Sequence, residues 1–572
     1  MNRFRPLILA VIVVLTGLLA YGLWTQPGPK PLDSEGFSSA RVIKDIEVIS
    51  KDHHSVAHPE ERAVVRQYLT DRLSGLGADT VMSFRYDSLS GPENKHVRYT
   101  FDAVDVCAEF APLQASDETT YMMIVAHYDS RYSQPMPKDT VWSYGAADDG
   151  YGVGVALETV SQLLKQREHW KQGVKVLFTD AEEVGMMGMK AIWENDRQVF
   201  DNVGFIINIE ARGPWGPALL FETSPGNEKV MDLYSDAARY PYTYSLTTVV
   251  YGFMPNFTDF TIVKDYIPGM NFSTIADINH YHTDLDNFSN VSEKSVQHYG
   301  VQILPVAMKY LRSDEYKDKD SLKSDRDATC FTIPGIGLIS FSKTGYLVIN
   351  LVIFVFFLLL FALEGVRGRL KASKVFRSSL VVLLSAVLVL VLGELMAFVC
   401  AKIAGAAFKP FGIIQGVTFD NAAMIGFTVL MTLVTLSVYI VSRQKVVMGV
   451  SGSMRASAIA NAVTRYAYNH LYASLALMFV LSAVLLFAIG ENLMFLIPLF
   501  CGTVAMSLYH LTSLRLWLPV AITFILLHAF SFLYALTMAL TIGAFGAVAM
   551  LAFLDLMVLI PLADLYMVPS RK

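Results

Sequence analysis

Three segments decide the fold: YMMIVAHYDS at residues 121–130, GAADDGYG at 145–152 and VKVLFTDAEEVG at 174–185. The first and third contain apolar runs, Met122–Val125 and Val174–Phe178, and each run is followed by polar residues. This pattern is typical of buried parallel strands that deliver side chains to a site at their carboxyl ends. The segments therefore predict an α/β sheet with a site at one edge.

The polar residues that follow the two runs are of types that bind metals. They are His127 and Asp129 after the first run and Glu182 and Glu183 after the second, with Asp148 and Asp149 in the Gly-rich turn between them. Carboxylate oxygens and neutral imidazole nitrogens are ligands for hard and borderline cations. Their convergence from several strand ends suggests a metal site.

The chain after this stretch continues the same alternation. Gly152–Leu164 reads as a helix, and Val203–Ile209 reads as another buried strand that ends in Glu210, Ala211 and Arg212. A later loop, HYHTDLDN at 280–287, places two histidines close to two aspartates. Strand and helix in alternation indicate an α/β sheet whose site lies at its carboxyl edge.

The segment before the central stretch reads as two helices between Ser38 and Leu76, joined by HHSVAHPEE, and Val97–Phe110 alternates like a strand. We interpret His53, His54 and His58 in the joining segment as exposed loop residues rather than ligands.

Composition divides the chain. Of 572 residues, 53% are hydrophobic, and the excess lies in Arg5–Trp24 and most of Tyr346–Met567, whereas about Pro27–Lys343 has ordinary globular composition. The net charge of −5 with no basic block argues against a nucleic-acid partner. Four cysteines are too few for a disulfide scaffold; Cys107 and Cys330 could pair or be two free buried thiols.

The apolar segments predict a multi-pass membrane protein in a lipid bilayer. Pro6–Trp24 follows Arg3 and Arg5 and reads as an uncleaved anchor with a cytoplasmic amino end; cleavage after Ala20 is the alternative. Seven further spans are expected at Tyr346–Glu364, Leu380–Cys400, Ala422–Val441, Leu471–Ile489, Leu493–Tyr509, Leu516–Leu536 and Leu540–Leu562.

Loop charges orient these spans. With the soluble domain outside, the cytoplasmic connections are Arg367–Arg377, Arg443–Arg465 and the turn at Arg515, and all are basic, as is the tail Arg571-Lys572. Both termini are then cytoplasmic, and the soluble domain is periplasmic, extracellular or lumenal. The expected domains are an anchor at 1–27, an exported domain at 28–343 and a polytopic membrane domain at 344–572.

Five motifs occur in the order found in a known family: AHYDS, GAADDGYG, DAEEVG, NIEARG and YHTDLDN. The sequence from roughly His53 to Gly300 resembles the co-catalytic di-zinc exopeptidases, which include secreted aminopeptidases, glutamate carboxypeptidase and multi-spanning endoplasmic-reticulum and vacuolar metallopeptidases. The resemblance implies a phosphorylase/hydrolase-like mixed sheet flanked by helices, the zinc exopeptidase fold, in addition to the all-α polytopic membrane domain.

The resemblance also implies roles for seven residues and a cofactor of two zinc ions per chain. Asp148 would bridge the two ions, His127 and Glu210 would complete one site, and Glu183 and His282 would complete the other. Glu182 would be the general base, and Asp129 would hold the His127 ring by accepting its other N–H. A carboxylate such as Asp148 suits the bridge because it has two oxygens.

Other polar residues nearby receive simpler interpretations. Asp149 is interpreted as a loop carboxylate that binds backbone N–H groups, and Asp284 and Asp286 as turn residues. Arg212 is either a salt-bridge partner or a substrate contact.

The favoured prediction is a membrane-bound zinc metalloprotease of the exopeptidase type, an aminopeptidase that hydrolyses N-terminal residues of peptides. The alternatives are a carboxypeptidase, a glutaminyl-cyclase-like enzyme that uses one zinc, or a peptide-capture domain of a transporter. Intramembrane acids would mark transport, and the candidates are Glu394, Asp555 and Asp564. The sequence carries no signal for an oligomeric state.

Overall fold

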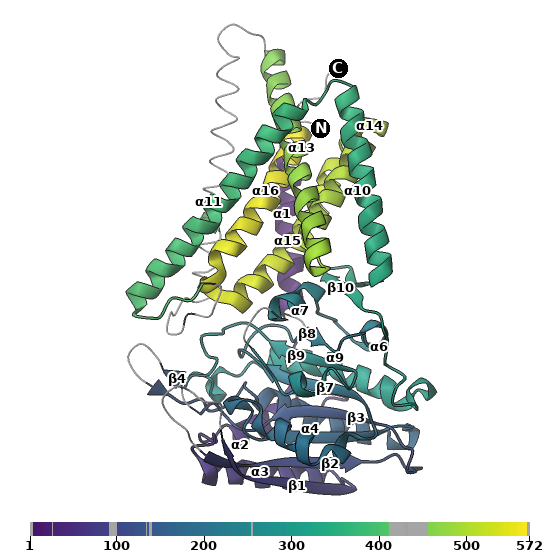
Figure 1. Ribbon diagram of the computed structural model, residues 1–572, viewed down its shortest axis with the longest axis vertical. Coiled ribbons are helices and arrows are strands. Elements are labelled where there is room, and N and C mark those ends of the chain that lie inside the picture. The colour runs from purple at the N-terminus through teal and green to yellow at the C-terminus, as the bar shows by residue number, and fades with distance from the viewer. Residues whose placement is uncertain are drawn as a thin grey trace. The chain divides into compact units, whose positions relative to one another are not determined.

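The structure is a computed structural model (Figure 1). It describes residues 4–25, 27–90, 100–132, 134–135, 140–252, 256–410, 414, 429–430, 432 and 456–568. The chain divides into two units. One is Trp24–Thr332 with Ile336–Lys343, and the other is Met1–Leu23, Ile333–Gly335 and Thr344–Lys572.

The first unit is built on a mixed seven-stranded sheet with the order β1-β2-β6-β3-β7-β9-β8. The strands are β1 (Thr80–Ser90), β2 (Thr100–Phe110), β3 (Tyr121–His127), β6 (Gly173–Thr179), β7 (Val203–Ala211), β8 (Leu219–Thr223) and β9 (Gly269–Thr274). The four central strands β6, β3, β7 and β9 are parallel, whereas β1, β2 and β8 pair antiparallel to their neighbours. This arrangement confirms the predicted mixed α/β sheet.

Side chains of β3 alternate between two cores because successive residues of a strand point to opposite faces. Met122, Ile124 and Ala126 belong to a large core with residues of α2 (Ser39–Ile49), α4 (Gly150–Leu164) and α9 (Glu293–Arg312). Met123 and Val125 belong to a smaller core with residues of α5 (Met187–Asn195) and α8 (Phe260–Val263). The sheet is therefore covered on both faces, which explains its nearly continuous apolar strands.

The remaining elements of this unit are short or peripheral. They are α3 (Pro59–Gly75), α6 (Glu228–Ala237), α7 (Ser245–Gly252), the two-stranded pairs β4 (Gln134–Pro135) with β5 (Thr140–Val141) and β10 (Ala328–Ile333) with β11 (Gly337–Ser342), and 3-10 turns at Arg167–His169, Glu182–Val184, Arg197–Phe200, Phe288–Asn290 and Asp314–Tyr316.

The predicted elements of the soluble part are confirmed with small shifts. The two early helices are α2 and α3, and α4 begins two residues before the predicted Gly152. The predicted strand Val97–Phe110 corresponds to β2, and its first three residues lie outside the described residues. Neither Cys107 nor Cys330 forms a disulfide bond.

The second unit is helical. Its helices are α1 (Arg5–Thr25), α10 (Lys343–Val366), α11 (Ala372–Ala404), α13 (Ala456–Ile489), α14 (Leu493–Thr512), α15 (Trp517–Leu540) and α16 (Phe545–Met567). Six described stretches are long and apolar enough to cross a membrane, and one of them, Trp517–Met567, contains both α15 and α16. The predicted span Ala422–Val441 lies outside the described residues, apart from 429–430 and 432.

The boundary between the last two predicted spans is shifted. The sequence places it between Leu536 and Leu540, whereas α15 runs to Leu540 and a 3-10 turn, Thr541–Ala544, separates it from α16. The apolar sequence is continuous here, so hydropathy does not locate the break. The structure shows it at Thr541, which has a positive φ of 53°.

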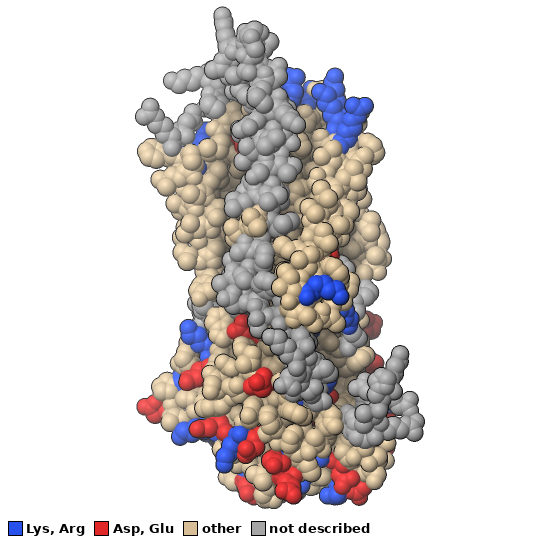
Figure 2. Space-filling view, turned by 90° about the vertical axis from the view of Figure 1, so that its left-hand side faces the viewer, with Lys and Arg blue, Asp and Glu red and all other residues tan. Residues whose placement is uncertain are grey.

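Close backbone approaches and polar contacts join the helices of this unit. A Cβ on Gly393 of α11 would lie 2.4 Å from the Cα of Gly546 in α16, so this crossing requires glycine. The Arg5 guanidinium donates to the carbonyl oxygens of Tyr566 and Val568, both at 2.8 Å, which ties α1 to the end of α16. On the face that Figure 2 shows, charged side chains are scattered over the α/β unit and are few on the helical unit, where Lys and Arg lie mainly at the upper end.

Candidate metal centre

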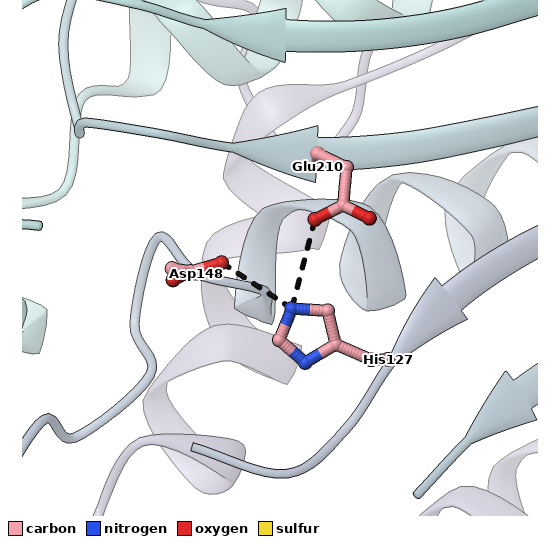
Figure 3. Close-up of side chains that lie close together, drawn as sticks. All are labelled: His127, Asp148 and Glu210. Carbon is pink, nitrogen blue, oxygen red and sulfur yellow. Dashed lines mark hydrogen bonds and ion pairs between the residues drawn. The ribbon is translucent and has the colours of Figure 1, made fainter. Parts of the chain in front are cut away.

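The first group of possible ligands comes from two parallel strands and the loop before α4 (Figure 3). His127 is the last residue of β3, and Glu210 is the penultimate residue of β7, the strand beside it. The His127 Nε2 atom lies 3.3 Å from Asp148 Oδ1 and 3.7 Å from Glu210 Oε2. One ligand atom from each of the three residues lies within 4.8 Å of the others, as a shared cation requires.

The second group shares Asp148. His282 Nε2 lies 3.3 Å from the other carboxylate oxygen, Asp148 Oδ2, and 3.0 Å from Glu183 Oε2. Asp148 therefore turns one oxygen toward each histidine. The structure brings together all five residues that the resemblance implied as ligands, in two triads that overlap at a single carboxylate.

Three buried atoms of the second triad lack hydrogen-bond partners among the described residues: Asp148 Oδ2, Glu183 Oε1 and His282 Nε2. Buried polar atoms normally make hydrogen bonds, so three atoms that make none, two of them only 3.3 Å apart, fit a bound cation. Burial, together with the charges of Asp148 and Asp259, raises the pKa of Glu210 to about 8. Divalent ions would reverse this effect by stabilising the ionised carboxylates.

The His127 ring is oriented by a contact at Nδ1, the ring nitrogen that does not face the other ligand candidates. Its Nδ1 atom lies 3.0 Å from the main-chain oxygen of Asp129 and 3.6 Å from the carboxylate Oδ1 of the same residue. With Nδ1–H donated to that main-chain oxygen, Nε2 is the nitrogen that faces the cluster. The resemblance implied that Asp129 accepts this N–H, and in the structure the main-chain oxygen of Asp129 lies closer to Nδ1 than its carboxylate does.

The Asp129 carboxylate holds the turn that carries Glu182. It accepts the backbone N–H of Glu182 at 2.9 Å and that of Glu183 at 3.4 Å. The turn is a 3-10 helix, Glu182–Val184, entered through Ala181 and left through Gly185, both in the left-handed region. Burial raises the pKa of Glu182 well above its usual range. The charge of Glu210 also raises this pKa, whereas His127 lowers it.

The loop that carries Asp148 is fixed by neighbouring carboxylates. Asp286 accepts the backbone N–H of Ala147 at 2.7 Å and of Asp148 at 3.3 Å, and it also accepts the Ser143 hydroxyl at 2.9 Å. The interpretation of Asp286 as a turn residue is therefore incomplete, because its side chain is buried and positions the shared ligand. Asp149 accepts the Gly152 N–H at 2.9 Å, which confirms its interpretation as a loop carboxylate.

Close packing beneath the same loop corrects one prediction. His54 is 1% exposed, so the interpretation of all three early histidines as exposed loop residues is wrong for this one. A Cβ on Gly145, which has a positive φ of 63°, would lie 3.2 Å from its ring. Burial lowers the pKa of His54 to about 4. The ring supports the loop and belongs to neither triad.

Two charged residues at the site were missed as functional candidates. Arg131 Nη1 donates to the main-chain oxygen of Glu183 at 2.7 Å and lies 3.2 Å from its Oε2. Asp259 accepts a hydrogen bond from the Thr179 hydroxyl at the end of β6. Arg131 directly follows the motif AHYDS, whereas Asp259 lies outside all five motifs.

The comparison with protein families decides the classification of this unit. Residues 106–307 match the model of peptidase family M28. This segment is a peptidase M28 domain. All five ligand candidates, and both Asp129 and Glu182, lie within the matched M28 segment.

Relatives of the M28 domain include membrane proteases. The chain is 28% identical over 252 residues to endoplasmic reticulum metallopeptidase 1 of Rattus norvegicus, which covers 42% of this chain and 26% of that protein. It is 29% identical over 180 residues to a vacuolar membrane protease of Candida dubliniensis, which covers 31% of this chain and 18% of that protein. The matches thus span about a quarter or less of these relatives.

Solved structures similar to this chain include a Zn-dependent exopeptidase from Parabacteroides distasonis, with 17% identity and a TM-score of 0.38, covering 48% of this chain and 98% of that one. A glutaminyl cyclase from Porphyromonas gingivalis has 16% identity and a TM-score of 0.37, covering 49% of this chain and 100% of that one.

Proposed function

We propose that the M28 domain is a zinc metalloexopeptidase that uses two zinc ions per chain to release N-terminal residues from peptides. The observation that carries the proposal is the pair of triads that share Asp148. The family match supports the hydrolase class, and relatives such as endoplasmic reticulum metallopeptidase 1 agree with it.

The donor set fits zinc. Imidazole nitrogen and carboxylate oxygen are zinc ligands, and three protein ligands for each ion leave room for water and substrate, as catalytic sites require. His127, Asp148 and Glu210 would hold one ion, and Asp148, Glu183 and His282 the other. Two zinc ions at these positions would polarise a scissile carbonyl and acidify a water molecule.

Glu182 is placed to move the proton. Its neighbour Glu183 contacts His282 in the second triad, whereas Glu182 belongs to neither triad. Because Asp129 fixes the backbone of the turn, the Glu182 carboxylate is presented to the site from a rigid support. We assign to it the general-base role, in which it accepts a proton from the attacking water and delivers it to the leaving amine.

The two complete triads favour a di-metal peptidase over the glutaminyl-cyclase-like alternative, which would need only one of them. The peptide end on which the enzyme acts is part of the proposal. Release of the N-terminal residue is proposed because, of two adjacent ions, one could hold a free amino group while the other polarised the scissile carbonyl.

The location and boundaries of the domain also belong to the proposal. Apolar helices such as α1 and α10 would hold the chain in a bilayer. Positive charges in the connections support a topology with both termini in the cytoplasm and the M28 domain, within about 28–343, on the opposite side.

The test uses the full-length chain purified in detergent and loaded with zinc. We expect release of N-terminal residues from a peptide mixture, and a loss of roughly a hundredfold or more in Glu182→Gln with zinc content unchanged. Glu168→Gln is the matched control, because that side chain is 60% exposed and lies outside both triads. A zinc-loaded, folded wild-type protein that hydrolyses none of the peptides would contradict the proposal.

A further inference from the structure

Arg212 is a charged residue at the edge of the metal centre that the mechanism does not use. It follows β7 directly and lies two positions after Glu210, so both residues are on the same side of the strand path. Its backbone N–H donates to the Ser273 hydroxyl and to the Thr274 carbonyl, both at 3.0 Å. The backbone of Arg212 is therefore fixed to the neighbouring strand β9.

The side chain, in contrast, has no hydrogen-bond or ion-pair partner among the described residues. Its Nε atom is shielded from solvent and makes no hydrogen bond within the described ranges, where no carboxylate forms an ion pair with the guanidinium either. Arg131, the other arginine at the centre, differs in this respect because it lies 3.2 Å from Glu183 Oε2. The residue as a whole is half-buried, so its guanidinium is partly withdrawn from water without the partner that such a charge normally has.

A second unpaired donor lies near the guanidinium. The guanidinium lies within electrostatic range of the hydroxyl groups of Tyr281 and Tyr251. The Tyr251 ring packs edge-on against Phe221 at 4.8 Å between centroids, and its buried hydroxyl has no partner among the described residues. Tyr281 stacks on the ligand candidate His282 at 3.6 Å between centroids. Together these groups present hydrogen-bond donors beside the metal centre.

Resting on the proposed function, we propose that Arg212 and Tyr251 bind a carboxylate of the substrate within one or two residues of the scissile bond. A guanidinium presents a planar fork of N–H donors that matches a carboxylate, and a phenol adds one further donor. Glu210 and Arg212 are two positions apart, which corresponds to roughly 7 Å along a strand. This is the length of about two extended residues of a bound peptide. The preferred substrates would then be dipeptides and tripeptides with a free carboxyl end, or peptides with an acidic residue next to the cleaved bond.

The test compares matched substrates on the zinc-loaded full-length chain. Pooled X-Gly dipeptides are compared with their C-terminal amides, and X-Glu amides with X-Gln amides, so that the two sources of the carboxylate are separated. We expect the wild type to prefer the carboxylate member of at least one pair by roughly ten- to hundredfold in kcat/KM, as charge-assisted hydrogen bonds allow. Arg212→Gln should abolish this ratio while hydrolysing the neutral member at a similar rate, and Arg212→Lys should restore part of the ratio.

Controls separate this inference from general damage and from the proposed function. Arg167→Gln removes an arginine that pairs with Asp79 away from the site, and it should keep the wild-type ratio. The inference is overturned if the wild type hydrolyses both members of both pairs equally, or if Arg212→Gln keeps the preference. Either result leaves the peptidase function standing.

A binding measurement requires no turnover. Dipeptide analogues with the scissile amide replaced by a methylene-amine are added as free acid and as amide, and the melting temperature is measured. The free acid should raise the melting temperature of the wild type more than the amide does, and the difference should vanish in Arg212→Gln. Equal shifts in the wild type overturn the inference even if no peptide is hydrolysed.

Discussion

Asp129 illustrates how one residue can orient two parts of the centre. Its main-chain oxygen lies 3.0 Å from His127 Nδ1, and its carboxylate accepts the N–H groups of Glu182 and Glu183. It is 1% exposed, so water does not compete for these bonds. A histidine at a strand end and the turn of the proposed base are thus held by the same residue.

Replacement of this carboxylate should affect turnover more than metal binding. Asp129→Ala removes the acceptor of two backbone N–H groups, and we expect kcat to fall roughly ten- to a hundredfold, as for other groups that orient metal ligands. Peptide hydrolysis and zinc content of the full-length chain provide the measurement. Asp129→Asn keeps one oxygen and should lose less; equal activity of wild type and Asp129→Ala would show that the turn holds without this residue.

Sequence reasoning was most successful at residues whose chemistry is recognisable. The five ligand candidates stand in motifs, and the structure gathers them. It missed Asp286 and His54, because an aspartate in a loop and a histidine before a helix look exposed until the fold buries them. The lack of a described hydrogen-bond partner at the Arg212 Nε atom depends on which groups lie near it in space, and sequence does not give that.

Elements of the α/β unit were predictable because the apolar runs are long. β3 and β6 pair in parallel, from Tyr121 opposite Gly173 to His127 opposite Thr179. The polar residues that follow the two strands therefore lie at the same edge of the sheet. The sheet order was less accessible, since β6 inserts between β2 and β3 and long-range pairing leaves no local signal. The ends of helices differ from the predicted ends by a few residues, because capping residues such as Asp149 determine where a helix begins.

His298 in helix α9 should make the α/β unit less stable at acidic pH. His298 is buried, and its Nδ1 accepts the Ala218 N–H at 2.9 Å, which requires a neutral ring. Burial lowers the pKa of His298 to about 4. The unfolded chain therefore binds a proton that the folded chain does not between about pH 6.5 and 4, and stability is lost as pH falls through this window.

The variant His298→Gln removes this titration while an amide oxygen can still accept the Ala218 N–H. From pH 6.5 to 5 the wild type should lose about 2 kcal/mol more than the variant. Thermal unfolding of the full-length chain at both pH values measures the difference. Parallel pH dependences in the two proteins would assign the acid sensitivity to other groups.

The whole molecule combines an α/β unit with a helical unit. Hydropathy was sufficient to predict the apolar helices because a span must be long and nearly free of charge. It failed at the break between α15 and α16, where backbone conformation rather than composition ends the helix. The orientation in the membrane remains a proposal from the charges of the connections.

Cysteine labelling in intact cells measures this orientation. Asp117 in the α/β unit and Lys374 at the start of α11 are both exposed. A membrane-impermeant thiol reagent should label Asp117→Cys in intact cells, or in sealed lumen-out vesicles if the membrane is internal, and should label Lys374→Cys only after lysis. The parent chain, whose four cysteines are buried or half-buried, gives the background. The reverse pattern would invert the proposed topology.

The central claim is that two zinc ions share Asp148, and metal analysis of the full-length chain tests it most directly. After zinc loading and dialysis, the wild type should contain close to two zinc per chain, and Asp148→Asn should contain fewer than one, because both triads lose a ligand. Asp284→Asn, an exposed residue in the loop of His282, should match the wild type. A wild type with one zinc or none, or an Asp148→Asn protein that still holds two, would contradict the account.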